Sequence, residues 1–180
     1  MKPLTLALLV FMTFTLSVSL AQERPDTSEK NKEKMLVFKD MVGNWKGDGN
    51  LQKGRDSSQK SLVDENVQTK LDGMLLVVEG TGKLADGSGK VVHHAFGVLS
   101  YDALADQYKF RAYLVDGRSA DAWFNVVGEN KFQWGFDVPG GKIRYTIVID
   151  AAAKTWNETG EFSRDEKTWF KTFEMNLKKV

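Results

Sequence analysis

The chain has 180 residues, a length within the range of one domain, and its 42% hydrophobic and 27% charged residues are ordinary for a globular protein. Its 25 basic and 24 acidic residues leave a net charge of +1, without the basic excess that nucleic-acid binding requires, so we expect no nucleic-acid partner. Because cysteine is absent, disulfides, thiolate catalysis and cysteine-ligated metal centres are excluded.

Residues 1–21 have the three parts of a secretory signal peptide. Lys2 supplies a positive charge, residues 4–20 are mostly apolar, and Ser19 and Ala21 put small residues where signal peptidase reads the chain. The apolar run is also about long enough to span a bilayer, so a retained membrane anchor is the alternative. The cleavage site favours removal. We therefore expect an exported protein, periplasmic or extracellular, with no membrane span after cleavage.

The next two segments lead into the folded domain. Residues 22–32 are polar and predict a flexible leader. Across residues 31–41 apolar side chains recur near helical spacing, which predicts a short helix that Gly43 ends. A helix in this position can plug one end of a barrel.

From Gly43 onward the chain alternates apolar-rich runs with turn signals made of Gly, Asn, Asp, Ser and Pro. Alternation of apolar and polar residues is clearest in residues 108–114, 132–136 and 143–149. A period of two with one apolar face predicts half-buried antiparallel strands. About ten such runs without intervening helices predict an all-β fold over residues 33–180. The expected architecture is a single antiparallel up-and-down β-barrel, because closure removes exposed strand edges.

The start of the first expected strand carries a family resemblance. Residues 41–49 resemble the opening of calycin-superfamily barrels, in which a short helix leads into a Gly-x-Trp motif, here Gly43 to Trp45. The small residues Gly47 and Gly49 make this segment more similar to the nitrobindin branch than to classical lipocalins. The resemblance implies a calycin-type barrel.

A second motif lies in the middle of the chain. Residues 97–102, followed by Tyr108, resemble the Leu-Gly-Tyr-Asp turn in a family of uncharacterised secreted bacterial domains with a lipocalin-like barrel. Ser100 stands where glycine is more usual in that family. The two resemblances together cover about residues 38–177.

Aromatic residues are the main candidates for the interior. Trp45, at the start of the first strand, has the size to cover the barrel floor while its indole N–H finds a carbonyl, and direct contact with a ligand is the alternative. The other residues expected to line the interior are Phe110, Phe124, Phe132, Trp134, Phe136, Tyr145, Trp169 and Phe173. Such rings either fill the barrel or surround one small ligand.

His93 and His94 are the only histidines, and as neighbours on a strand they point to opposite faces. They cannot both bind one metal ion, and we expect no metal site. A histidine in the lumen could ligate haem or bind a ligand carboxylate; otherwise one histidine is exposed and the other lies in the wall. Nitrobindin-like haem proteins place their proximal histidine late in the chain, but residues 155–180 contain none, so haem is disfavoured and no cofactor is expected.

Arg111 and Tyr113 form an Arg-x-Tyr pair similar to the one that holds a ligand carboxylate in fatty-acid-binding proteins. The opposite face of this strand is the more apolar one, so a solvated Arg111 on the outside is the alternative.

These patterns favour a binding protein over an enzyme. The main hypothesis is that a small apolar molecule binds inside the barrel. The alternatives are a haem-binding or enzymatic barrel that uses a lumen histidine, and a filled barrel that acts through its surface. No catalytic residue is predicted and the oligomeric state is left open. The candidate ligand-binding residues are Trp45, His93, His94, Phe110, Arg111, Tyr113, Trp134, Tyr145 and Trp169.

Overall fold

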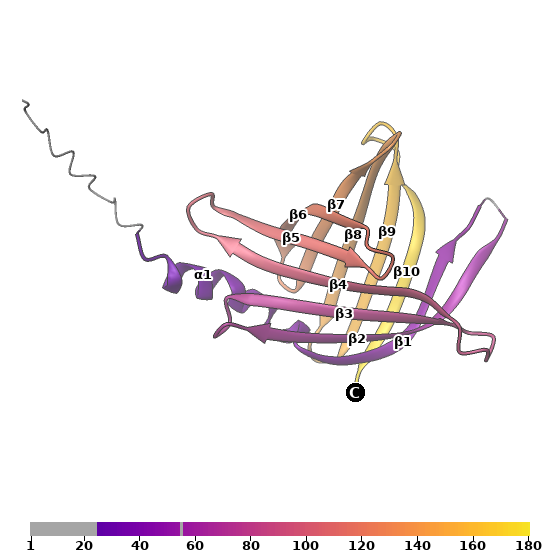
Figure 1. Cartoon of the computed structure of the whole chain (residues 1–180), viewed down its shortest axis with the longest axis horizontal. Helices are drawn as coiled ribbons and strands as arrows, with labels where there is room; N and C mark the ends of the chain where they lie inside the picture. The colour runs from indigo at the N-terminus through magenta and orange to yellow at the C-terminus, as the bar shows by residue number, and fades with distance from the viewer. Residues whose placement is uncertain (1–24, 55) are drawn as a thin grey trace, which may run out of the picture.

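The computed structural model describes residues 25–54 and 56–180 (Figure 1). Ten antiparallel strands in this part of the chain form a closed barrel, in which consecutive strands pair and β1 closes the ring by pairing with β10. The predicted all-β, up-and-down barrel with a short N-terminal helix is confirmed. The expected signal peptide lies outside the described residues.

Two short helices precede the strands. The α-helix α1 begins at Ser28, earlier than expected, and so includes the end of the segment predicted to be a flexible leader. The apolar part of the predicted helix continues as a 3₁₀ helix, η1. The elements are α1 (Ser28–Met35), η1 (Leu36–Met41), β1 (Gly43–Gln52), β2 (Ser58–Lys70), β3 (Leu75–Leu84), β4 (Val91–Asp102), β5 (Gln107–Leu114), β6 (Ser119–Gly128), β7 (Lys131–Val138), β8 (Gly141–Asp150), β9 (Thr155–Ser163) and β10 (Phe170–Lys179).

The barrel is strongly coiled. In Figure 1, β1 to β4 run across the view while β7 to β10 run nearly perpendicular to them. Where β1 crosses β10, Gly47 pairs with Leu177, and the carbonyl oxygen of Asn176 occupies the place that a Cβ atom of residue 47 would need. A glycine is therefore required there, because only a residue without a side chain lets the two strands approach so closely.

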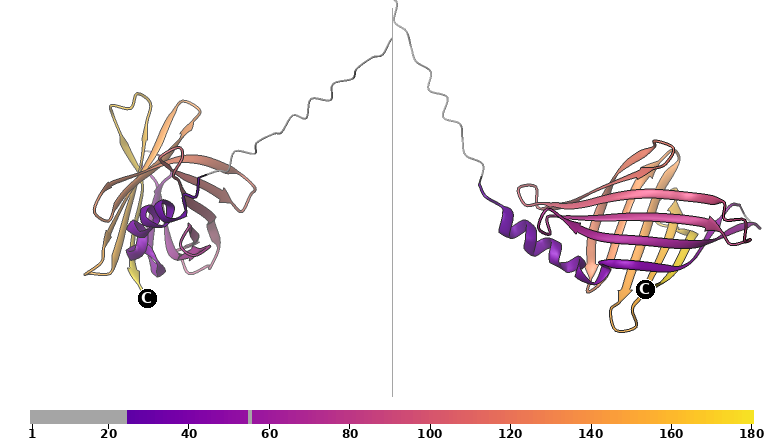
Figure 2. Two further views of the ribbon diagram at one scale, coloured as in Figure 1. Left: turned by 90° about the vertical axis from the view of Figure 1, so that its left-hand side faces the viewer. Right: turned by 60° about the horizontal axis from the view of Figure 1, so that its bottom comes forward.

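The helices close one end of the barrel (Figure 2). Phe38 of η1 is only 1% exposed, and its ring lies 5.4, 5.5 and 4.9 Å from the rings of Tyr108, Phe124 and Phe132. The Tyr108 hydroxyl donates a hydrogen bond to the backbone carbonyl of Lys34 at 2.9 Å. The predicted helical plug is confirmed, and the half of the barrel beneath it is a packed core.

Trp45 belongs to this closed end. It is 1% exposed, its indole N–H donates to the carbonyl oxygen of Met41 at 2.8 Å, and its ring meets Trp156 edge-on at 5.8 Å. The structure therefore places Trp45 in the core, where it joins η1 to the barrel wall, which is the role predicted from its position at the start of β1.

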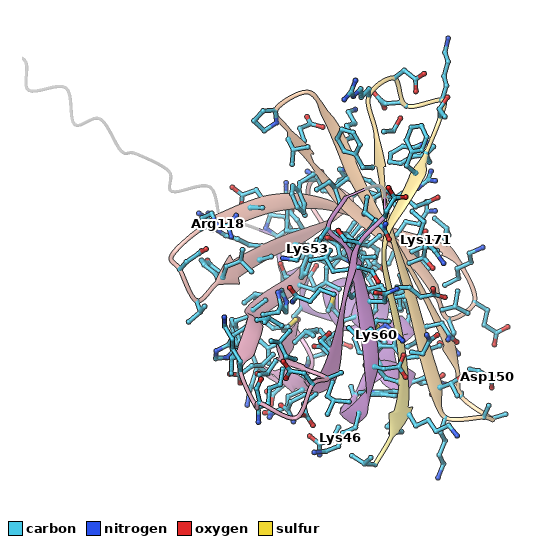
Figure 3. The ribbon with its side chains drawn as sticks, turned by 90° about the vertical axis from the view of Figure 1, so that its right-hand side faces the viewer. Lys46, Lys53, Lys60, Arg118, Asp150 and Lys171 are labelled. Carbon is cyan, nitrogen blue, oxygen red and sulfur yellow. The ribbon has the colours of Figure 1, made fainter. Side chains whose placement is uncertain are left out.

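Charged side chains cover the outside of the barrel. Figure 3 shows Lys46, Arg118 and Asp150 extending from the ribbon, and all three are exposed. An ion pair of 2.7 Å joins Lys46 to Asp64 across the β1–β2 pair. No helix of the described residues has the length and apolar character needed to cross a membrane.

Candidate functional site

The half of the barrel remote from the helices differs from the closed half. Its inner-face side chains are half-buried, whereas those beneath the plug are almost completely buried. The half-buried aromatic residues of this open half are Phe110, Trp134, Phe136, Tyr145, Phe162 and Phe173. Rings that are neither fully packed nor fully solvated form the kind of wall that holds a small apolar molecule.

Four of these rings form a contiguous aromatic cluster, which we call the aromatic wall. Trp134 of β7 and Tyr145 of β8 stack with centroids 4.2 Å apart and planes inclined by 13°. Phe110 meets Trp134 edge-on at 5.1 Å, and Phe173 meets Tyr145 edge-on at 6.1 Å. The aromatic wall therefore extends over β5, β7, β8 and β10 and does not depend on a single strand.

Glycines on the neighbouring strands β4 and β9 give the rings of the aromatic wall the space they need. A Cβ atom on Gly97 would lie 2.7 Å from the ring of Phe110, and one on Gly160 would lie 2.7 Å from the ring of Tyr145. Both distances are shorter than carbon atoms tolerate, so the rings lie directly on glycine backbone. Alanine at either position would displace the ring it faces.

A buried carboxyl group lies beside the aromatic wall. Glu158 of β9 is 7% exposed and accepts a hydrogen bond from the indole N–H of Trp134 at 3.2 Å. Burial raises the pKa of Glu158 to about 7, and the indole N–H groups of Trp134 and Trp156 oppose that rise because they favour the ionised form. A carboxyl group of this kind titrates near neutral pH.

A second carboxyl group reaches the interior from β2. Glu65 lies between Val63 and Val67 on the inner face of β2, and its carboxylate fills the space above Gly80 on β3. Burial raises the pKa of Glu65 to about 8, and the negative charges of Glu158 and Asp64 add to the rise. The charge of Glu158 thus acts on Glu65, and the two residues are here called the carboxyl pair.

The structure brings some of the predicted site residues together at the open half. Phe110, Trp134 and Tyr145 belong to the aromatic wall. His93 lies on the inner face at the open rim, next to Gly82, and its side chain is exposed. Trp45 lies at the opposite, closed end and does not join them.

Other predicted site residues lie on the outer face. His94 pairs with Glu79 at 3.1 Å, so of the two histidines only His93 shares the inner face. Arg111 forms an ion pair of 3.4 Å with Asp121 and lies over the ring of Tyr113, which is 42% exposed. Arg111 therefore lies on the outside of the barrel, as the alternative prediction stated. Because side chains alternate along β5 and Phe110 points inward, Arg111 and Tyr113 point outward.

Trp169 was expected to line the interior, and the structure corrects this expectation. Its ring lies under the guanidinium group of Arg144 at 3.9 Å, on the outer face, and its indole N–H donates to the carbonyl of Glu166 at 3.2 Å. The physical reason is a β-bulge between Lys171 and Phe173, which breaks the alternation on which the expectation relied.

The sequence analysis missed both members of the carboxyl pair. The sequence did contain a signal in each strand. Glu158 occupies the same strand face as Trp156 and Gly160, and Glu65 occupies the same face as Val63 and Val67. A glutamate at an apolar position of a strand pattern marks a buried charge.

The described residues contain no group of three or more histidine, aspartate or glutamate side chains placed to hold a metal ion. The barrel interior thus holds the aromatic wall and two carboxyl groups whose pKa values burial raises to about 8 and about 7, and His93 lies at the open rim.

Known proteins resemble this chain in fold but not recognisably in sequence. No protein-family model matches the chain, and no curated protein is recognisably similar in sequence. Among solved structures, Rv2717c from M. tuberculosis superposes with a TM-score of 0.60 at 10% identity, covering 81% of this chain and 96% of that one. The S-type phycobiliprotein lyase CPES from Guillardia theta superposes with a TM-score of 0.57 at 10% identity, covering 85% and 96%. These likenesses show the fold alone, a closed antiparallel β-barrel of ten strands.

Proposed function

We propose that this protein binds a small, flat, predominantly apolar molecule in the open half of its barrel. The observation that carries the proposal is the aromatic wall, in which Trp134 and Tyr145 stack and yet remain half-buried. When a ligand covers aromatic surface that is not fully packed, water is removed from that surface and the free energy of the complex falls. The alternative of a filled barrel accounts for the packed core of the closed half. It does not explain why the rings of Trp134 and Tyr145 remain half-buried.

The similarity to a protein named a phycobiliprotein lyase supports this proposal at the level of the fold only. The predicted export belongs to the same proposal. Residues 1–21 carry the signal-peptide pattern, so the ligand is expected to be encountered in the periplasm or outside the cell.

Binding of the neutral fluorescent probe N-phenylnaphthylamine tests the proposal. We expect saturable binding, and Trp134→Leu should weaken it about tenfold because the probe loses its stacking surface. Trp123→Leu is the matched control, since Trp123 packs on the outer face of Gly135 and is 38% exposed. Fluorescence titration of the three proteins measures the effect. Equal affinities of the two variants, or no saturable binding at all, would contradict the proposal.

A further inference from the structure

We propose that the carboxyl pair makes the open half selective for organic cations, that is, flat apolar molecules that carry a protonated nitrogen. This inference rests on the proposed function, because the cation is expected to lie against the aromatic wall. It adds a charge preference that aromatic surface alone does not supply.

The first support is the position of the two carboxyl groups. Glu65 lies on β2 and Glu158 on β9, and both side chains project from the inner face, one toward Gly80 and the other toward Trp134. The negative charge of Glu158 is felt at Glu65 across the intervening strands β1 and β10. Two groups of the same charge that face one interior repel each other, and a cation between them relieves the repulsion.

The second support is the absence of a counter-charge in the described part of the chain. None of the ion pairs there includes Glu65 or Glu158. Among residues 25–54 and 56–180, no hydrogen-bond donor reaches Glu65, and only the indole N–H of Trp134 lies within hydrogen-bond geometry of Glu158. Buried carboxylates are ordinarily paired, because an isolated buried charge costs several kcal/mol.

The third support comes from Trp156, which is 2% exposed and has an indole nitrogen without a hydrogen-bond partner. The N–H lies close enough to Glu158 to favour the ionised carboxylate, although it does not reach hydrogen-bond geometry. The surroundings of Glu158 are thus arranged to tolerate a negative charge, yet they lack the positive charge that would balance it. A ligand ammonium or ring N–H⁺ would supply that charge.

The aromatic wall fits the same class of ligand. The faces of Trp and Tyr rings attract cations as well as apolar rings, and carboxylates beside such faces strengthen the attraction. An anionic ligand would be repelled by these carboxyl groups as they ionise, and it would find no basic side chain paired with them. The site therefore favours cations over neutral molecules and neutral molecules over anions.

Three tricyclic probes of similar shape test this inference on the purified protein: aminoacridine as the cation, anthracenemethanol as the neutral molecule and anthracenecarboxylate as the anion. We expect aminoacridine to bind about tenfold more tightly than anthracenemethanol, and anthracenecarboxylate to bind most weakly. Glu158→Gln and Glu65→Gln should each remove most of the preference for the cation. Binding of anthracenemethanol should change little.

Glu79→Gln is the matched control, because Glu79 precedes Gly80 on β3 but points outward to His94. It should leave the order of the three probes unchanged. If the wild-type protein binds the cation and the neutral probe equally well, the inference is overturned while the proposed function stands. If none of the probes binds, both fail. If a glutamine variant does not fold, the order of the three probe affinities for the wild-type protein by itself tests the inference.

Discussion

The folded barrel is expected to lose several kcal/mol of stability as the pH is raised from about 5 to about 8.5. The cause is the carboxyl pair, whose pKa values of about 8 for Glu65 and about 7 for Glu158 lie above the ordinary value of 4.5. Between these values the folded protein holds protons that the unfolded chain has released. Unfolding therefore releases protons, and raising the pH favours it; the contribution is complete at low pH and disappears as the pH passes the folded-state pKa values.

His93 acts in the opposite direction at the acidic end of this range. Partial desolvation by neighbouring atoms lowers the pKa of the exposed His93 below 6.5, with a further contribution from His94, so the unfolded chain binds this proton more tightly. The fall in stability should consequently be steepest between about pH 6.5 and about pH 7, where both carboxyl groups contribute and His93 no longer opposes them, and it should end above about pH 8. Urea unfolding at a series of pH values, followed by tryptophan fluorescence, measures the slope.

Glutamine variants separate the two carboxyl groups. Glu158→Gln and Glu65→Gln should each flatten the slope and make the protein more stable than the wild type at about pH 8.5, because the amide needs no counter-charge. Glu79→Gln, on the outer face, should leave the slope as it is. A wild-type stability that is constant or rises with pH over this range would show that the two glutamates are not held protonated by the fold.

Phe38→Ala is expected to cost about 4 kcal/mol in the free energy of unfolding. The ring is 1% exposed and contacts three other aromatic rings at the closed end, so its removal leaves a cavity between η1 and the strands. The surrounding rings are attached to β5, β6 and β7, which limits how far they can collapse into the space. Urea unfolding and the near-ultraviolet circular dichroism of the aromatic cluster measure the loss.

Leu36→Ala provides the comparison for this variant. Leu36 belongs to the same 3₁₀ helix but is 65% exposed, so its truncation should change stability by less than about 0.5 kcal/mol. A loss of less than about 1 kcal/mol for Phe38→Ala would mean that the helices do not close the barrel in solution.

The sequence by itself determined the barrel and its closed end. Strict alternation in residues 108–114 and 143–149 requires one apolar face per strand, and a long series of such strands joined by turns has few solutions other than closure. The place of Trp45 followed from its size and its position between a helix and the first strand. The burial of Phe38 followed from its place in the apolar pattern of the predicted helical plug.

Only the tertiary structure decided what meets in the open half. Alternation tells which side chains share a face within one strand, but a single bulge resets it, as Trp169 shows after the irregularity between Lys171 and Phe173. Alternation also carries no information about distances across a closed ring. Glu65 and Glu158 are far apart in the chain, and the charge of Glu158 acts on Glu65 because barrel closure leaves only β1 and β10 between β2 and β9.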